Sequence, residues 1–410
     1  MIQKRNLESL NGSASAHNQT SRPEAPHQIW LTHSLSDYSG FWPRSQELCA
    51  ARCYAFQCAE ILDVRCSTIA AAGNVETLFV AVVDAEKNPL MLLPLGIQRR
   101  HGVRVLTFLD GGLSDYNSPV VFPATRDWGP EDVRMVWREL QANLPFFDVA
   151  ILDKMPERVG DLPNPLILLG ETRHTVSGHA TTLSGTWSHF KAERLPRRRM
   201  VGNHRRRLLG RGRLTFEIAK TSQQRDAFLA ALIRQKIRLH RETRTSAEFD
   251  QPGYREFVTE MTNRPSTAGI IHLSALKVED TIVAVHWGYV VGSRFYALIS
   301  AYEGGAWARF SPGRLLYEHF FEWSFAQGIE IFDFGIGDED YKLEYCDVEI
   351  ALHLLDIPVT LRGAEYSVAL KITKMLRRKV SNTRVGSVLK YLLRKGPEHN
   401  HVAAAPETHK

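Results

Sequence analysis

The stretch "FDFGIGDEDYKLEY", residues 332–345, places Gly335 and Gly337 directly before three consecutive acids, with Tyr341 and Lys342 next. Such a turn suits either a metal or dinucleotide loop or the mouth of an active site at a strand end. A dinucleotide loop needs a third glycine leading into a helix, and these acids would repel a pyrophosphate. The ligand spacing of an EF-hand is absent as well. The stretch therefore predicts either an acceptor-side active-site turn or a solvent-facing acidic turn.

A second candidate site is the helix start in "ARFSPGRLL", where Ser311 is the expected N-cap and Pro312 the first helical residue. Gly313 allows close backbone approach, and Arg309 and Arg314 flank the turn. Cations at a helix N-terminus oppose the helix dipole, so an external anion held by free N–H groups and the arginines would explain them. The alternative is an ordinary cap with two solvated arginines.

An earlier helix start, "DWGPEDVR", has the opposite charge. Asp127, Glu131 and Asp132 lie near the positive end of the helix dipole, which is the usual stabilising choice. These carboxylates would repel a phosphate. The sequence therefore predicts a binding function for the later helix start and a scaffold function for the earlier one.

A repeat positions both helix starts. Residues 77–111 and 270–302 each read as three strands rich in Val, Ile, Leu and Phe, separated by turn residues. Each run is followed by a loop, a helix of about four turns and a short apolar strand, at 129–152 and 311–335. A strand, "RLTFEIAK", and two helices precede the second run. The pattern predicts two copies of one mixed α/β unit.

This order resembles the GNAT superfamily of acyl-CoA transferases, in which a turn between a strand and a helix binds the cofactor pyrophosphate. More narrowly, "YEGGAWARFSPGRLLYEHFFEW", "FDFGIGDEDYKLEY" and "NHRRRLLGRGRLTFEI" resemble the CelD/BcsL type, associated with cellulose biosynthesis. That family is similar to the FemABX aminoacyltransferases in having two GNAT-like units. The resemblance runs from about Trp30 to about Pro358 and includes "LPLGIQRR" and "SDYNSP". It departs from the usual Gln/Arg-x-x-Gly-x-Gly/Ala loop, because Gly313 is the one glycine after Arg309.

The resemblance implies an α/β fold of tandem GNAT-like domains, each a mixed, mostly antiparallel sheet flanked by helices, with acetyl-CoA or another acyl-CoA as cofactor. The expected cofactor-binding residues are Arg309, Phe310, Ser311, Gly313 and Arg314. The strand ending at Gly335 should splay to admit the pantetheine arm, so Gly335, Gly337 and Lys342 are expected to line the acceptor side. No metal site is expected.

Acyl transfer from a thioester needs a base for the nucleophile and an acid for the leaving thiolate. Asp338 and Glu339 are candidate bases, with His286 on the middle strand and Glu303 after the third strand as rivals. A core histidine is an equally good interpretation of His286. Tyr341 is the candidate acid. Lys342 is expected to bind an anionic acceptor or to pair with Asp338.

The bulk composition fits two soluble domains, since a chain of 410 residues is longer than a typical single domain and 44% of it is hydrophobic. We expect a disordered tail at 1–27, a degenerate GNAT-like domain at 28–175, the transferase domain at 176–365 and a basic tail at 366–410. The first 27 residues lack an apolar signal segment, so the expected location is the cytoplasm. Cys49, Cys53, Cys58 and Cys66 are expected within one helix as small apolar residues, and Cys346 as a bystander thiol.

The net charge of +6 hides two basic segments. Residues 191–213 hold ten Lys/Arg and one Glu, and residues 366–396 hold nine Lys/Arg and no acid. Such runs bind nucleic acid or anionic lipid, or form solvated helix faces. No aromatic residue is interleaved in 197–213 for base stacking, which favours a solvated face there. Apolar residues at helical spacing in the second segment fit a weak peripheral membrane contact.

The predicted function is acyl-CoA-dependent N- or O-acyl transfer to a small-molecule or saccharide acceptor, as in polysaccharide or cell-envelope biosynthesis. One alternative is an aminoacyl-tRNA-dependent transferase, for which residues 191–213 would hold the RNA. Another is a non-catalytic GNAT scaffold at a polysaccharide synthase. The sequence does not identify the acceptor, the acyl chain or the oligomeric state.

Overall fold

The structure is a computed structural model that describes residues 27–38, 40–46, 51–123, 128–243 and 248–382. The tail predicted at 1–27 lies outside these residues except for His27, which is buried and pairs with Glu139 at 3.0 Å. Among the described residues, no helix combines the length and the hydrophobicity that a membrane crossing requires.

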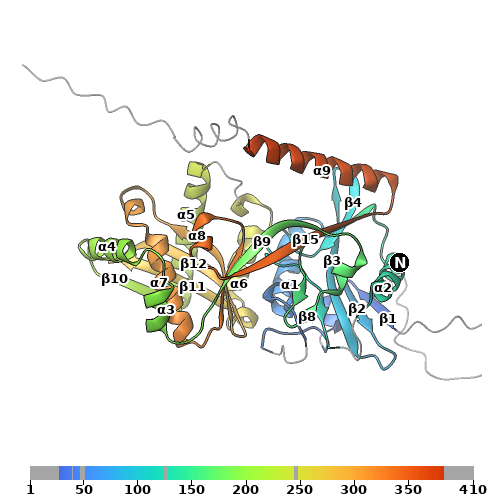
Figure 1. Ribbon diagram of the computed structural model, residues 1–410, viewed down its shortest axis with the longest axis horizontal. Helices are drawn as coiled ribbons and strands as arrows, with labels where there is room; N and C mark the ends of the chain where they lie inside the picture. Colours follow the sequence, from blue (N-terminus) through green and yellow to red (C-terminus); the bar gives the residue numbers. More distant parts are fainter. Residues whose placement is uncertain (1–26, 39, 47–50, 124–127, 244–247, 383–410) are drawn as a thin grey trace, which may run out of the picture.

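The first unit has the predicted order of a three-stranded meander, a helix and a strand (Figure 1). Its strands are rich in buried apolar residues and are joined by short turns, as the sequence pattern predicted. Its elements are β1 (Gln28–Thr32), α1 (Ala59–Arg65), β2 (Glu76–Val83), β3 (Pro89–Arg100), β4 (Val103–Phe108), β5 (Val120–Val121), α2 (Pro130–Asn143) and β6 (Val149–Pro156).

The second unit repeats this order and adds a strand and two helices before it, as predicted. Its elements are α3 (Trp187–Glu193), α4 (Arg198–Leu209), β10 (Leu214–Ile218), α5 (Ser222–Thr243), α6 (Tyr254–Asn263), β11 (Ile271–Val278), β12 (Thr281–Val291), β13 (Arg294–Tyr302), α7 (Pro312–Ala326), β14 (Ile331–Ile336) and α8 (Asp340–Leu343). Helix α7 covers one face of β11, β12 and β13, and α5 covers the other.

Both units share one sheet, with the strand order β1-β2-β3-β4-β6-β15-β9-β14-β13-β12-β11-β10. The two central strands, β9 (Arg173–Thr182) and β15 (Val348–Pro358), are antiparallel neighbours. Strand β9 pairs with β14 of the second unit, whereas β15 pairs with β6 of the first. A small ribbon of β7 (Arg158–Val159) and β8 (Leu162–Pro163) stands apart. The predicted mixed α/β fold of two GNAT-like units is thus confirmed.

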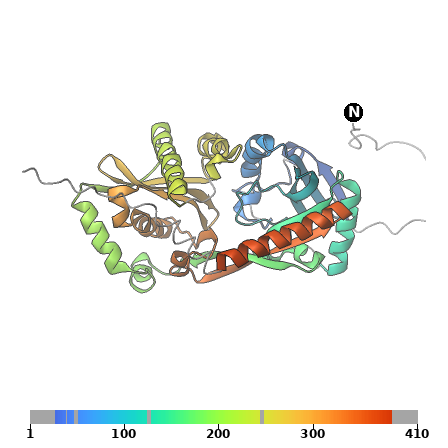
Figure 2. The same cartoon turned by 90° about the horizontal axis from the view of Figure 1, so that it is seen from above.

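The last helix, α9 (Leu361–Asn382), follows β15 back onto the first unit. It contacts β4, β6 and β15, and Figure 2 shows it lying across this side of the sheet. Residues 366–382 of the predicted basic tail therefore belong to a helix. The membrane contact predicted for 366–396 stays a prediction, and residues 383–396 lie outside the described residues.

The single helix predicted over the four N-terminal cysteines is wrong. Cys58 has an extended backbone, with φ −67° and ψ 143°, and the helix begins after it at Ala59. Tertiary contacts hold the preceding segment, since the Trp42 indole donates to the Gln57 carbonyl oxygen at 2.8 Å. Cys49 lies outside the described residues.

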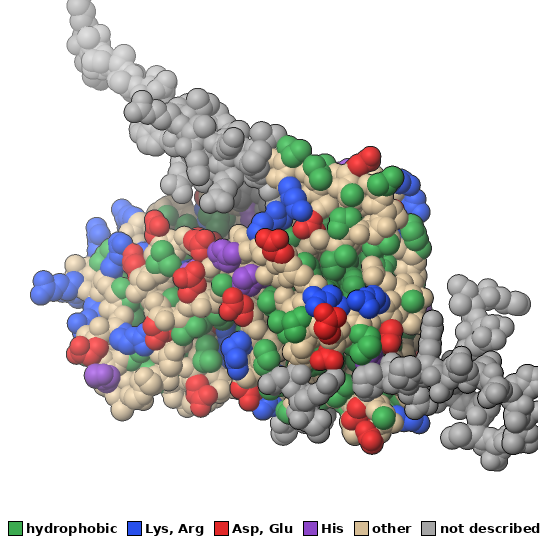
Figure 3. Space-filling view, turned by 45° about the vertical axis from the view of Figure 1, so that its right-hand side comes forward, with side chains coloured by type: hydrophobic (Ala, Val, Ile, Leu, Met, Phe, Trp, Pro, Cys, Tyr) green, Lys and Arg blue, Asp and Glu red, His purple; other side chains and the backbone are tan. Residues whose placement is uncertain are grey.

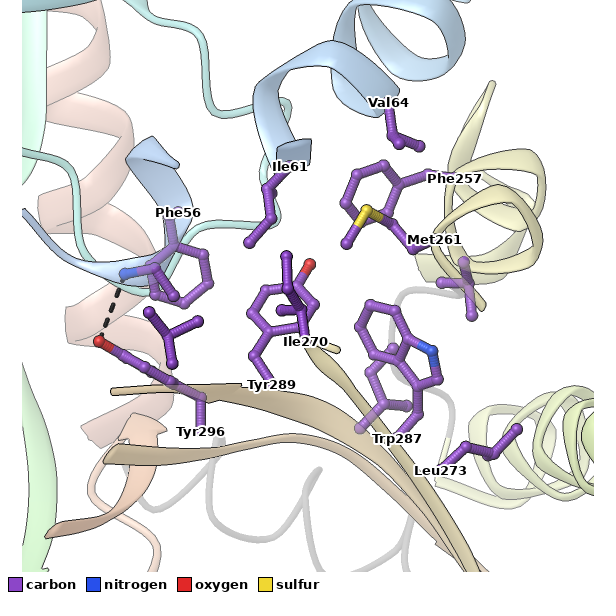
Figure 4. Close-up of a cluster of buried hydrophobic side chains, with 14 of the residues drawn as sticks. Phe56, Ile61, Val64, Phe257, Met261, Ile270, Leu273, Trp287, Tyr289 and Tyr296 are labelled. Carbon is purple, nitrogen blue, oxygen red and sulfur yellow. Dashed lines mark hydrogen bonds between the residues drawn. The ribbon is translucent and has the colours of Figure 1, made fainter. Parts of the chain in front are cut away.

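A buried aromatic cluster joins the two units (Figure 4). Phe56 and Ile61 from the first unit face Phe257 and Tyr289 from the second, all of them nearly fully buried. The backbone N–H of Ala55 also donates to the Tyr296 hydroxyl at 3.3 Å. Removing a large buried side chain from such a core costs about 3–5 kcal/mol. This packing fixes the first unit against the inner face of the second unit's sheet.

Candidate active site

Strands β13 and β14 pair over only part of their length. They run parallel and are matched at three residue pairs, from Arg294 with Ile331 to Tyr296 with Asp333. Beyond these pairs β13 continues to Tyr302 and β14 to Ile336, but the two strands no longer pair with each other. Strand β13 also has a bulge, because three of its residue steps match two steps of β12. The strands thus diverge after Asp333, at the place where the sequence predicted an opening.

Helix α7 begins beside this opening. Ser311 has φ +48°, a left-handed conformation uncommon for serine, and its side chain makes no capping hydrogen bond. Its carbonyl accepts from Arg314 N–H at 3.0 Å. No acidic residue lies in the first turn. A helix start that lacks both a side-chain cap and an acid suits an anionic ligand.

The two predicted arginines at this start have different environments. Arg309 is exposed and its guanidinium lies 4.9 Å from the centre of the buried Phe310 ring. Arg314 instead pairs with Glu344 at 2.8 Å, and Glu344 also accepts from Arg197. Arg309 is therefore available to a ligand, whereas Arg314 is already engaged by a carboxylate.

On the α7 side, aromatic residues line the opening. Tyr317 of α7 is hydrogen-bonded to Ser300 of β13 and to Tyr341. The rings of Tyr317 and Tyr341 are stacked 5.9 Å apart, and Tyr317 also contacts Phe334 of β14 at 5.2 Å. Burial raises the pKa of Tyr341 well above its usual value. The phenol therefore stays protonated and can donate a hydrogen bond.

On the face of the sheet opposite α7, a buried ion pair lies at the last position where β13 and β14 pair. Arg294 donates from Nε to Asp333 Oδ2 at 2.9 Å, and the Tyr116 hydroxyl donates to Asp333 Oδ1 at 2.9 Å. Asp333 is fully buried and also accepts from the Gly335 N–H at 2.7 Å. Breaking such a pair by removing one partner costs about 3–5 kcal/mol. The pair locks β14 at the point where it leaves β13.

Asp115, from the first unit, reaches the same point. Its carboxylate accepts a hydrogen bond from the backbone N–H of Ile336, and it lies so close to Gly335 that a Cβ there would be 2.2 Å from Oδ2. Gly335 has φ +72°, so this close approach requires glycine. Burial and the nearby Asp333 charge raise the pKa of Asp115 to about 7, against the opposing effect of Lys154 and Lys342. The side chain keeps some exposed surface.

Asp115 is the carboxylate that sequence reasoning missed. A general base works best when its pKa lies near the working pH, which Asp115 satisfies. Its motif "SDYNSP" was noted only as part of the family resemblance, because nothing local in a loop between strands indicates contact with residues more than two hundred positions away. The contact between Tyr116 and Asp333 depends on the docking of the two units.

The predicted acidic turn lies at the rim of this arrangement. Asp338 is two-thirds exposed and its Oδ1 lies 2.9 Å from His179 Nε2. Glu339 is more than half exposed and pairs with Lys342 at 3.0 Å. Lys342 is buried and also donates to the Ile336 carbonyl oxygen. The predicted pairing of Lys342 with Asp338 is therefore wrong, because the lysine pairs with Glu339 and Asp338 lies against His179. The Gly337 N–H donates to the Ser177 carbonyl oxygen at 3.1 Å.

The remaining predicted residues lie away from Asp115. His286 is fully buried between β12 and α7, with its ring 4.5 Å from that of Phe320, and burial depresses its pKa well below the usual value. Glu303 accepts from Arg234 and Gln235 of α5, both at 3.3 Å. Burial raises the pKa of Cys346 to about 12, so its thiol is protonated at neutral pH.

Together, the opening and the helix start fit an acyl-CoA. A pantetheine arm can replace the missing strand pairing between β13 and β14, and a pyrophosphate suits the acid-free start of α7. Asp115 then lies on the face of the sheet opposite α7.

Comparison with known proteins agrees with this architecture. Residues 196–343 match the family model described as Acetyltransferase (GNAT) domain. This range contains α4, β10 to β14 and α8. Residues 196–343 therefore match a GNAT acetyltransferase domain, and this match supports an acyltransferase. No curated protein matched the sequence.

Solved structures share the fold over most of the chain. A crystal structure of FemX aligns with a TM-score of 0.55 and 10% identity, covering 83% of this chain and 99% of that one. A conserved protein of unknown function from Bacteroides thetaiotaomicron VPI-5482 aligns with a TM-score of 0.50 and 12% identity, covering 80% and 99%. At such identities the similarity concerns the fold alone. It extends to both units.

Proposed function

We propose that the protein transfers an acyl group from acyl-CoA, most simply acetyl-CoA, to an amine or hydroxyl group of a small-molecule or saccharide acceptor. One observation carries the proposal: β13 and β14 separate after Asp333 beside the acid-free start of α7. Ser311 and Gly313 would hold the phosphates with Arg309. The thioester would then lie near Gly335, within reach of groups on both faces of the sheet.

Asp115 is the base in this proposal. Its carboxylate takes the proton of the acceptor amine or hydroxyl while that atom bonds to the thioester carbonyl carbon. The carbon–sulfur bond then breaks and the thiolate leaves, taking up the proton from Asp115 or from water. Tyr341, kept protonated by its raised pKa, donates a hydrogen bond to the sulfur. Asp338 and Glu339, at the rim, orient the acceptor.

The more specific assignments depend on the resemblance alone. These are the CelD/BcsL type and a role in polysaccharide or cell-envelope biosynthesis. The proposed cytoplasmic location depends instead on the polar composition of residues 1–27. The aminoacyl-tRNA-dependent alternative has one supporting observation, the ten Lys/Arg residues of 191–213. Strong salt dependence of RNA binding would be its signature.

Calorimetric titration with acetyl-CoA and CoA tests the proposal. Binding at micromolar concentration, with a thermal shift that grows with ligand concentration, is the expected result. Mass spectrometry of the acceptor after turnover on a panel of amines and sugars would identify the product. If neither thioester nor CoA binds and tRNA does, the acyl-CoA proposal is wrong.

A further inference from the structure

Three arginines from two segments surround one buried ring. The guanidinium carbons of Arg207 and Arg211 lie 5.9 and 6.0 Å from the centre of the Phe310 ring, and that of Arg309 lies 4.9 Å from it. Arg207 belongs to α4 and Arg211 to the turn after it. The basic helix therefore ends beside the loop that leads into α7.

These three arginines have no acidic partner among the described residues, and they share this with Arg198, Arg199, Arg206 and Arg213 of the basic segment. What sets them apart is that their guanidiniums gather around one ring. Arg194, Arg197 and Arg205 pair with Asp347, Glu344 and Glu318. No ion pair involves Arg207, Arg211 or Arg309, and all three are exposed. Like charges gathered without a counter-charge raise the free energy of the unliganded protein and favour an external anion.

We propose that Arg207 and Arg211 are part of the acyl-CoA site and bind phosphate at its nucleotide end, above all the 3′-phosphate. This inference rests on the proposed function. Phe310 directly precedes Ser311, so the three guanidiniums lie next to the helix start that would hold the pyrophosphate. Arginine suits the task because its planar fork binds phosphate oxygens in pairs.

RNA is the competing ligand for a basic helix. Binding of single-stranded bases uses exposed aromatic faces, but the Phe310 ring is only 3% exposed beneath the guanidiniums. Several Lys and Arg side chains are visible at the end of the molecule where α4 lies, with Asp and Glu side chains among them (Figure 3). A compact, multiply phosphorylated ligand fits this surface better.

The test compares CoA with dephospho-CoA, which lacks the 3′-phosphate. Titration calorimetry would measure both affinities for the parent and for Arg207→Gln with Arg211→Gln. We expect CoA affinity to fall at least about tenfold and dephospho-CoA affinity to fall less than about threefold, because charge-assisted phosphate contacts are lost only with the former. The preference for CoA should largely disappear.

A matched control is Arg198→Gln with Arg199→Gln, which removes the same charge from exposed residues in the first turn of α4. At physiological salt its effect on CoA affinity should stay below about twofold, because screening limits distant charges. Equal losses in both double variants, or unchanged CoA affinity in the first, would overturn the inference. So would loss of tRNA binding in the first variant with CoA affinity intact. A parent that binds neither CoA form would instead refute the proposed function, and the inference with it.

Discussion

The helix starts of the two units differ in their charge and capping. At α2, the extended Gly129 donates its N–H to Asp132 Oδ2 at 3.0 Å, and Glu131 pairs with Arg134. At α7, Ser311 is left-handed and no acid follows it. The first start satisfies its own N–H groups and dipole with its own carboxylates. The second start has no such carboxylate.

The strand openings differ in the same way. In the first unit, β4 and β6 pair at only two positions, Val105 with Val149 and Leu106 with Ala150. Asn117 then occupies the gap, donating its backbone N–H to the Lys154 oxygen at 3.0 Å and its amide to the Asp153 oxygen at 3.1 Å. The loop that closes the first opening also carries Asp115 into the second unit. One segment therefore fills the gap between β4 and β6 and places Asp115 beside Gly335.

The largest expected effect follows from Asp115→Asn. Transfer should slow by about 10²–10⁴, the usual cost of losing a general base, while CoA affinity stays unchanged. In the parent, the rate should rise with pH through about 7, because the base acts only when deprotonated. The rate of the variant should not show this rise with pH. A pH profile of kcat/KM would decide, and an unchanged profile would exclude Asp115 as the base.

Stability provides the control for this variant. The folded-state pKa of Asp115 lies above its unfolded value, so the parent loses stability from this group as pH rises from about 4 to about 7. Asparagine does not ionise and escapes that loss. Thermal melts at pH 8 should therefore show the variant at least as stable as the parent. The same substitution at the exposed Asp338 should lower the rate less than tenfold.

Gly313→Glu should have the next largest effect, because it gives α7 the acid that α2 has at the same helical position, Glu131. A Cβ at Gly313 would lie 3.8 Å from Tyr302, so the side chain fits. Repulsion of the pyrophosphate should weaken CoA binding by about 10–100-fold. Gly313→Gln, equal in size and uncharged, is the matched control. Equal affinities for the two variants would argue against phosphate at this helix start.

The smallest effect is expected from Asp132→Ala in the first unit. Losing the carboxylate at the start of α2 should cost about 0.5–2 kcal/mol of stability, measured by denaturant unfolding. CoA affinity should not change. A drop in affinity as large as that of the Gly313 variant would show that the first unit also binds the cofactor.

The fold was largely predictable from the sequence, because each strand and helix of the repeat carries its own period and turn residues. The acid-free helix start at Ser311 was also predictable, because the cap residue, the proline and the lack of acids are all local features of the sequence. The shared sheet was not, because the residues that pair with β15 are 168 or more positions away and the sequence of β15 does not indicate them. Asp115 and the Arg207–Phe310 contact were missed likewise, since both join segments that meet only after the units dock. The bases predicted from the local pattern, Asp338 and Glu339, are exposed, whereas Asp115 is partly buried.

The return of β15 to the first unit sets an order for the protein's synthesis. Strand β6 is complete at Pro156, but the neighbour that covers its edge arrives only with Val348–Pro358. At about 5–20 residues per second, the ribosome would leave that edge open for roughly 10–40 s. An uncovered apolar edge strand is a template for pairing with other chains. A fragment ending before β15 would keep this edge uncovered and should therefore aggregate more readily than the full chain.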